Sequence, residues 1–317
     1  MMSRVVEGKF IFSVETGTCP VAHYFVSLMR RLEQFHGVKI ITYALMSNHF
    51  HILVEEPQRR LESITDAALV ERVEALNGKK AGAELAWLLS HLRVELKSDE
   101  AAEECKARYL KRMGNVSEFV KDLKSRFAMW YNRRMGRYGV LWADRFKSVL
   151  VEGGRALWTM AAYIDLNSVR AGLVEDPKDY RWSGYGEAMG GNSELAQSGL
   201  MELFGEQGKV EWEMGAIAYR KLLFSRGEEH VAEEGQRGKR GIAPERVREV
   251  LEGNGTLSFG ELMRCRVRYF ADGLVLGTKG FVENVFEENR EKFGKTRKTG
   301  ARKMKGGNPK GQAPNGP

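Results

Sequence analysis

The chain has 317 residues, of which 43% are hydrophobic, so it is long enough for one large domain or two ordinary ones with a proper core. No segment approaches the roughly 20 consecutive apolar residues that a membrane-spanning helix needs, and the opening MMSRVVEGKF lacks the apolar stretch of a signal peptide. We therefore expect a cytoplasmic protein with no membrane partner. The net charge of +8 indicates a polyanionic partner, although residues 291–317, with eight Lys or Arg against one Glu, contribute +7 of it.

The first part of the chain alternates strand and helix patterns. Residues 8–14 (GKFIFSV) predict a short strand, and a helix is expected from Val21 to Phe35. The apolar face of that helix holds Phe25, Leu28, Met29 and Leu32. Two β-rich runs, residues 38–45 and 49–56, flank a short polar turn and predict a β-hairpin.

The middle of the chain is mainly helical in pattern. Residues 57–113 are charged and rich in helix-forming residues, and an amphipathic helix is expected from about Val116 to Arg133. A short strand at 148–152 (SVLVE) then precedes a helix from about Arg155 to Arg170, which Gly172 terminates.

The composition changes after about residue 190. Residues 187–209 are rich in Gly, Ser and Glu and predict a linker, and residues 210–290 form helical segments of their own. Thr278 and Lys279 are expected to open the last helix of a module that resembles a helix-turn-helix and would bind DNA. A small helical appendage or a dimerisation element is the alternative. Residues 291–317 have almost no apolar content and are expected to be a disordered basic tail.

Two histidines stand at alternate positions of the second predicted strand. Alternate side chains of a strand share a face, so His49 and His51 point the same way while Phe50 and Ile52 pack on the other side. Two imidazoles on a polar strand face can converge on one cation. A structural role for the pair is the alternative. Glu55 lies on the same face and is either a further ligand or a solvated strand end.

A tyrosine and an asparagine lie one turn apart on the predicted helix at 155–170. Tyr163 and Asn167 are spaced i, i+4 and therefore lie one above the other on the helix surface. An Asn oxygen can ligate a hard cation, and a nearby cation would stabilise a phenolate. A core tyrosine and a capping asparagine are the alternative.

Basic and aromatic residues are interleaved in the stretch between these two patterns. Candidates for phosphate contacts are Arg133, Arg134, Arg137, Arg145 and Lys147. Candidates for stacking on bases are Trp130, Tyr131, Tyr138 and Trp142. The alternative places Trp142 and Phe146 in the core and the basic residues on a solvated face.

The combination of segments resembles a known family. TYALMSNHFHILVE resembles the signature of HUH single-strand endonucleases, and RYGVLWADRFKSVLVE followed by AAYIDLNSVRAGLVEDPKDYRWSGY resembles REP-associated tyrosine transposases. The resemblance covers about residues 3–186 and has its two blocks in the expected order. It departs from the family at the start, where the chain begins inside a strand that the family usually has in full, and at Ser168, which stands in a position that is often proline.

The resemblance implies an α+β fold, the ferredoxin-like antiparallel sheet with helices of HUH endonucleases, over residues 1–186 with a helical insertion at about 57–113. It implies that His49, His51 and Asn167 hold Mg²⁺ or Mn²⁺ and that Tyr163 is the nucleophile. The implied reaction cuts and rejoins single-stranded DNA beside a hairpin repeat through a 5′-phosphotyrosine. The protein would then act near nucleoid DNA, as a monomer or a homodimer.

Three other functions remain open from the sequence. A replication or mobilisation nickase would use the same chemistry, but the chain has no GxxxxGK[ST] sequence for a helicase domain. A zinc hydrolase would use His49, His51 and Glu55 and would not need Tyr163. A catalytically degenerate DNA-binding protein would keep the fold without the reaction.

Overall fold

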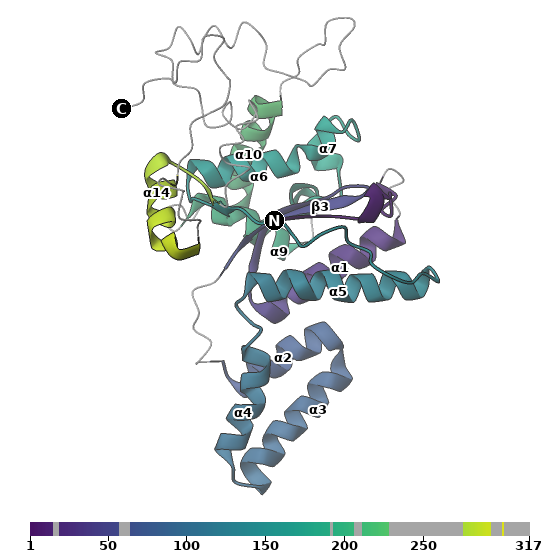
Figure 1. The fold of residues 1–317 in the computed structure, drawn as a ribbon, viewed down its shortest axis with the longest axis vertical. Coiled ribbons are helices and arrows are strands. Elements are labelled where there is room, and N and C mark those ends of the chain that lie inside the picture. The colour runs from purple at the N-terminus through teal and green to yellow at the C-terminus, as the bar shows by residue number, and fades with distance from the viewer. Residues whose placement is uncertain are drawn as a thin grey trace, which may run out of the picture. The chain divides into compact units, whose positions relative to one another are not determined.

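The computed structural model describes residues 1–14, 19–56, 64–190, 193–205, 211–227, 275–292 and 300 (Figure 1). The chain forms two compact units that are each discontinuous in sequence. The first unit contains residues 1–146 and 180–200, and the second contains residues 147–179 and 201–317. In the described part of the chain helices predominate over a small antiparallel sheet, which confirms a mixed helix and sheet protein.

The sheet of the first unit has three strands, β1 (Met2–Arg4), β2 (Lys39–Leu45) and β3 (His49–Glu55). Their order is β1-β3-β2, and β3 is antiparallel to both neighbours. Strands β1 and β2 are therefore parallel, with β3 between them, and helix α1 connects them as the crossover. The expected hairpin of β2 and β3 is confirmed.

Helix α1 (Pro20–His36) has a sequence cause at each end. Cys19 caps its first turn because the thiol accepts a hydrogen bond from the Ala22 amide, and Pro20 fits the first helical position. Gly37 ends it with a left-handed φ of 66°. The four residues of the expected apolar face are all buried.

Helix α5 (Val116–Arg134) packs beside α1 and completes the core of the first unit (Figure 1). Asn115 caps its start by accepting from the Glu118 amide. Phe127 of α5 lies 5.1 Å from Phe25 of α1 and 5.5 Å from Phe12, measured between ring centroids. Phe12 lies in an irregular segment that follows the short turn η1 (Val6–Gly8), so the strand predicted at 8–14 was wrong. The amides of Ile11 and Phe12 bond to the Ser47 carbonyl, outside any ladder.

A group of helices forms a lobe of its own in the first unit (Figure 1). It consists of α2 (Asp66–Asn77), α3 (Lys79–Ser90), the π-helical turn η4 (His91–Glu95) and α4 (Asp99–Leu110). Arg93 ties them together through ion pairs with Asp66, Asp99 and Glu103. The helical character expected for 57–113 is confirmed over 66–110.

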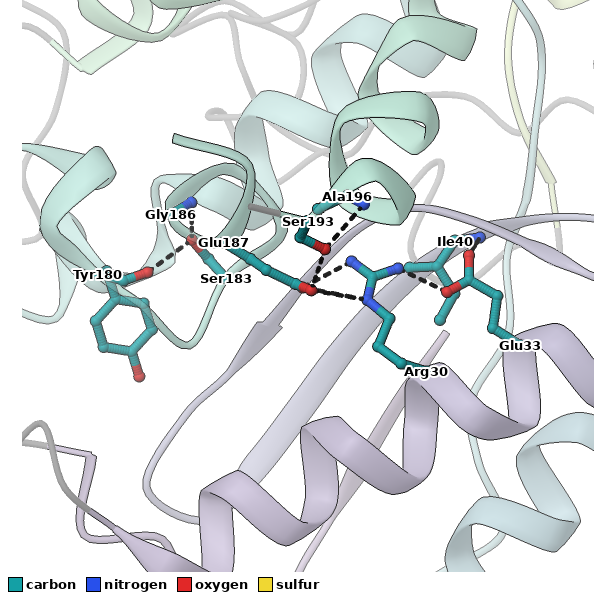
Figure 2. A network of polar contacts seen from close by, with 9 residues as sticks. All are labelled: Arg30, Glu33, Ile40, Tyr180, Ser183, Gly186, Glu187, Ser193 and Ala196. Carbon is teal, nitrogen blue, oxygen red and sulfur yellow. Dashed lines mark hydrogen bonds and ion pairs between the residues drawn. The ribbon is translucent and has the colours of Figure 1, made fainter. Parts of the chain in front are cut away.

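Helices α8 (Gly184–Met189) and α9 (Glu194–Met201) return the chain to the first unit. Figure 2 shows the guanidinium of Arg30, from α1, between the carboxylates of Glu33 and Glu187, at 2.7 Å from each. Ser193 donates to Glu187 and caps α9 by accepting from Ala196. A linker was predicted at 187–209, but this range contains α9 and the turn η6 (Glu202–Phe204), so the prediction was wrong there. The small residues of this range allow close packing and do not mark a linker. A Cβ on Gly199 would lie 2.0 Å from the Ile40 carbonyl of β2.

The second unit is built around α6 (Arg155–Asp165) and α10 (Trp212–Gly227). It also contains α7 (Asn167–Arg170) and the turn η5 (Pro177–Asp179). Strand β4 (Leu150–Val151), within the expected run, pairs in parallel with β5 (Val275–Leu276).

Helix α14 (Lys279–Glu288) begins after Thr278, whose hydroxyl accepts from the Phe281 amide, so the predicted start of the last helix is confirmed. The turn η7 (Arg290–Lys292) follows it. The rest of the predicted helix-turn-helix-like module and nearly all of the basic tail lie outside the described residues.

Candidate functional site

The two histidines of β3 lie next to each other on one face of the sheet. Their ring centroids are 5.1 Å apart and the rings meet edge to face at 84°. Both are half-buried, whereas Phe50 between them is buried and packs on Phe25 and Trp142. The alternation expected of a strand is therefore present, and it places both imidazoles on the sheet face opposite Phe50.

Asn48 fixes the orientation of the first histidine. The Asn48 side-chain oxygen lies 2.7 Å from Nδ1 of His49, and its amide nitrogen donates to the Gly8 carbonyl. An amide that donates through its nitrogen on one side presents its oxygen on the other, so Nδ1 of His49 is the donor. Nε2 then carries the lone pair, which is the arrangement typical of a histidine that binds a metal.

Both imidazoles are held neutral by their surroundings. Burial, followed by the positive charge of Arg4, lowers the pKa of His49. Burial lowers the pKa of His51 to about 3, with smaller contributions from the positive charges of His49, the N-terminal amine and Arg4. Arg4 stands opposite His49 in the β1–β3 register and so belongs to the same face. Neutral imidazole is the form that ligates metals, so the pair fits a divalent cation.

Glu55 does not join the two histidines. It lies at the exposed end of β3, opposite Lys39 of β2. In the part of the chain that the structure describes, no three His, Cys, Asp or Glu side chains come together as a metal cluster. The three-residue zinc site that a hydrolase would need is thus not formed by His49, His51 and Glu55.

Tyr163 and Asn167 lie in the second unit, at the end of α6 and the start of α7. The predicted single helix is interrupted at Leu166, but the Leu166 amide still bonds to the Ala162 carbonyl, so the one-turn spacing persists. The Asn167 side-chain nitrogen donates to the Tyr163 and Ile164 carbonyls, both at 3.1 Å. This leaves the side-chain oxygen of Asn167 directed away from those carbonyls, as a ligand would require.

The Tyr163 ring is at the surface, with 37% of the residue exposed. The Arg170 guanidinium lies over it, 4.9 Å from the ring centroid, and also donates to the Tyr163 carbonyl. Sequence reasoning missed Arg170, although its i, i+7 spacing from Tyr163 places it two turns away on the same helix face.

Asp165 anchors the tyrosine helix from the opposite side. It is fully buried, and its carboxylate accepts a 2.6 Å hydrogen bond from the Tyr219 hydroxyl of α10. Because Tyr163 is exposed and Asp165 is buried, α6 is oriented about its own axis with Tyr163 toward solvent and Asp165 toward Tyr219. Ser168 is also buried and donates to the Asp165 carbonyl, which explains how serine fits at this position.

The predicted DNA-contact residues divide into exposed and buried groups. The exposed group consists of Arg133, Arg134, Arg145, Lys147 and Tyr138, of which Tyr138 is 96% exposed. Lys147 belongs to the second unit and the other four belong to the first. Arg137 is half-buried over the Tyr131 ring, and Trp130 stacks on Tyr24 at 3.8 Å.

Two of the aromatic residues predicted to stack on bases are core residues instead. Trp142 is buried among Phe25, Phe50 and Phe127, and its ring nitrogen donates to the Lys124 carbonyl. Tyr131 is buried beside Phe127. The prediction was wrong for these two because a sequence window does not record which side chains pack against Phe127 in the core.

Comparison with known proteins gives no match: neither a family model, nor a curated protein, nor a solved structure is significantly similar to this chain. In the described ranges, no helix combines the length and the apolar character needed to cross a membrane.

Proposed function

We propose that the chain is a metal-dependent, single-tyrosine DNA transposase that cuts and rejoins single-stranded DNA. The observation that carries this proposal is the pair of neutral histidines on β3, one of them oriented by Asn48 with Nε2 available. The surface-exposed tyrosine with an asparagine one turn later adds to it, as does the resemblance of residues 3–186 to REP-associated tyrosine transposases. The β1–α1–β2–β3 arrangement is compatible with half of a ferredoxin-like sheet.

In this proposal His49, His51 and Asn167 hold Mg²⁺ or Mn²⁺. The cation would withdraw electron density from the scissile phosphate. Histidine ligation favours Mn²⁺ intrinsically, and Mg²⁺ is more available in cells. Nickel, copper or zinc would bind the imidazoles more tightly still, so metal identity is part of the test.

Tyr163 supplies the nucleophile. Its phenol loses a proton and its oxygen forms a bond to phosphorus, while the bond from phosphorus to the 3′ oxygen breaks. That oxygen leaves with the electron pair and takes up a proton, which gives a 5′-phosphotyrosine and a free 3′-hydroxyl. A 3′-hydroxyl of a second strand reverses the step and restores a phosphodiester without ATP.

The DNA partner in this proposal is a hairpin repeat with a single-stranded flank, which places the protein at nucleoid DNA. The exposed Arg133, Arg134 and Arg145 would contact phosphates. Tyr138 and the outer face of Trp130 would stack on unpaired bases.

The test is a cleavage assay on labelled single-stranded DNA from the repeats that flank the gene, with Mn²⁺ or Mg²⁺. We expect the wild type to form a covalent protein–DNA adduct and a 3′-hydroxyl product. Tyr163→Phe and His49→Ala should abolish both, and Tyr109→Phe, a tyrosine of α4, should leave both unchanged.

Each other outcome rejects the proposal in a different way. Metal-dependent cutting that survives Tyr163→Phe indicates hydrolysis without a covalent intermediate. Binding of the DNA without cleavage, whichever metal is added, indicates a degenerate DNA-binding protein. Adduct formation only on a replication or transfer origin indicates a nickase.

A further inference from the structure

Arg4 is a positive residue on the same sheet face as the histidine pair. It lies directly opposite His49 in the antiparallel pairing of β1 with β3, and opposed residues of such a pair project to one face with Cβ atoms about 5 Å apart. Burial is the main cause that lowers the pKa of His49 and of His51, and the charge of Arg4 contributes in both cases. The guanidinium therefore lies near both imidazoles.

The backbone of Arg4 is held on both sides. One neighbour is His49 of β3, and on the other side the Arg4 carbonyl accepts a 3.0 Å hydrogen bond from the Ala143 amide. The next residue, Val5, forms a bridge to buried Trp142. The side chain of Arg4 is exposed. A fixed backbone thus directs a solvent-accessible guanidinium to the histidine pair.

Arg4 has no acidic partner among the residues that the structure describes. In that part of the chain, no carboxylate lies within ion-pair distance of its guanidinium. Glu7, the acidic residue closest to it along the chain, pairs with Lys9 at 2.6 Å. Asp144 interacts electrostatically with Lys124. The charge of Arg4 is therefore available to an anion from outside.

This arginine opposes the binding of a cation at the histidine pair. A divalent cation on the two imidazoles would be repelled by the guanidinium, because both groups are positive. The N-terminal amine near His51 adds little to the repulsion, since burial lowers its pKa to about 6. Two imidazoles also fill only part of the coordination sphere of Mg²⁺ or Mn²⁺, and both metals accept oxygen ligands. An anion in contact with the cation and with Arg4 would relieve the repulsion and complete the sphere.

A DNA phosphate meets both requirements. One of its non-bridging oxygens can bind the cation while the other accepts from the guanidinium, whose planar fork matches phosphate geometry. We propose that Arg4 binds a phosphate of single-stranded DNA beside the histidine pair, so that the divalent cation and the DNA each strengthen the binding of the other. The inference rests on the proposed function and adds to it a linkage, in which the cation binds weakly until DNA is present.

The test measures Mn²⁺ binding to the full chain by titration calorimetry, with and without a single-stranded oligonucleotide from the repeats that flank the gene. Every protein carries Tyr163→Phe so that no DNA is cleaved, and the ionic strength is constant. We expect the oligonucleotide to raise the Mn²⁺ affinity about tenfold, and Mn²⁺ to raise the oligonucleotide affinity by the same factor. A protein that also carries His49→Ala measures the Mn²⁺ that the DNA binds on its own.

Replacement of Arg4 should act in opposite directions on the free and the DNA-bound protein. Without DNA, Arg4→Gln should bind Mn²⁺ about fivefold more tightly, because the repulsion is removed. With DNA, the gain in Mn²⁺ affinity should fall to about twofold or less. Arg4→Lys keeps the charge without the fork, so it should keep the weak binding without DNA and only part of the gain with DNA.

Arg108→Gln is the matched control. Arg108 of α4 has a side chain that is 76% exposed, and its replacement removes the same charge from the helical lobe. It should leave the Mn²⁺ affinity and the gain with DNA unchanged. Circular dichroism checks that each variant is folded. An arginine that only supported β1 would not give tighter Mn²⁺ binding when it is replaced.

Equal or weaker Mn²⁺ binding by Arg4→Gln without DNA overturns the inference, and so does a gain with DNA that Arg4→Gln keeps in full. If the protein with Tyr163 intact still forms the covalent adduct, either result leaves the proposed function standing. A linkage that depends on Arg4 in a protein that forms no adduct supports the phosphate site and rejects the transposase reaction. No Mn²⁺ binding to the histidine pair, with or without DNA, overturns both.

Discussion

Asn48 connects the histidine pair to two other parts of the first unit. Its side chain contacts Nδ1 of His49 and the Gly8 carbonyl, and its backbone carbonyl accepts from the Val5 amide at 2.9 Å. The residue lies in the turn before β3, where sequence reasoning assigned it only a turn role. A short polar residue beside a potential ligand is the one signal in the sequence that marks it.

Replacing Asn48 should weaken metal binding without removing a ligand. We expect Asn48→Ala to lower Mn²⁺ affinity about tenfold, because the His49 ring loses the acceptor that sets its tautomer. Asn48→Asp keeps an oxygen and should retain the affinity. Titration calorimetry measures this directly, with thermal unfolding as the check on folding. Equal affinity in Asn48→Ala would show that the contact does not orient a ligand.

His36 is a fully buried polar residue of the first unit outside the candidate site. Its Nδ1 lies 2.9 Å from the Arg112 carbonyl and its Nε2 lies 3.0 Å from Asp122, which also pairs with Arg112. The Gly114 amide donates to the His36 carbonyl at 2.6 Å, so the residue joins α1 to the connection between α4 and α5.

We expect His36→Leu to lower the free energy of unfolding by about 2–4 kcal/mol, because it leaves a partly buried carboxylate and a carbonyl without this partner. Urea unfolding followed by tryptophan fluorescence measures the change. A loss within about 0.5 kcal/mol, as for an ordinary surface substitution, would contradict a structural role for this bridge.

At the level of elements, the strongest sequence patterns predicted boundaries that lie within about one residue of the observed ones. Helices α1 and α5 and the β2–β3 hairpin follow from residue patterns along the sequence, whereas the caps Gly37 and Asn115 were recognised only in the structure. The segment around Phe12 and the α9 region failed because composition was misleading there. Buried aromatic residues in an irregular segment resemble a strand, and small residues such as Gly199 resemble a linker when their contacts are unknown.

Helix α10 should stabilise the tyrosine helix through Tyr219. In Tyr219→Phe the buried carboxylate of Asp165 loses a 2.6 Å hydrogen bond, which should cost about 2 kcal/mol. Hydrogen exchange should rise in α6 and α10 and stay unchanged in α1. Tyr138→Phe, at an exposed position, is the control. Unchanged exchange in α6 would mean that other contacts of the unit suffice to anchor it.

The ion pair between Asp176 and Arg220 of α10 is sensitive to acid. Burial alone would raise the pKa of Asp176, but hydrogen bonds from Arg220 and the Lys178 amide and the charges of both residues outweigh it and lower that pKa below the ordinary 3.8. Since the folded-state pKa is depressed, the stabilisation is complete above pH 3.8 and is lost as pH falls through the lowered value.

Asp176→Asn should therefore be less stable than the wild type near neutral pH, by about 1 kcal/mol or less for a partly exposed pair. The difference should shrink once the pH falls below the ordinary value for aspartate. Thermal unfolding from pH 7 downward measures both curves. A constant difference across this range would show that the carboxylate charge is not the cause.

At the level of the whole molecule, the relative placement of His49 and His51, and that of Tyr163 and Asn167, could be predicted because each pair lies close together in the sequence. Spacings of two on a strand and four on a helix determine neighbours without knowledge of the fold. The burial of Trp142 was only an alternative at the level of the sequence, and the anchoring of Asp165 by Tyr219 could not be predicted, since both contacts join segments far apart in sequence. The same applies to the course of the chain, which leaves the first unit after Phe146 and returns at Tyr180.

The return of the chain to the first unit at Tyr180 predicts that a protein cut at residue 186, where the family resemblance ends, is less stable. A chain that ends after Gly186 lacks Glu187 and α9, so Arg30 loses one of its two carboxylate partners and β2 loses the helix that approaches it at Gly199. We expect it to be at least about 3 kcal/mol less stable to urea than a chain that ends after Gly205, which keeps Glu187 and α9 and equally lacks α10. Glu187→Gln in the full chain isolates the ion pair and should give part of this loss. Equal stabilities would instead make residues 1–186 a self-sufficient domain and α9 an accessory to it.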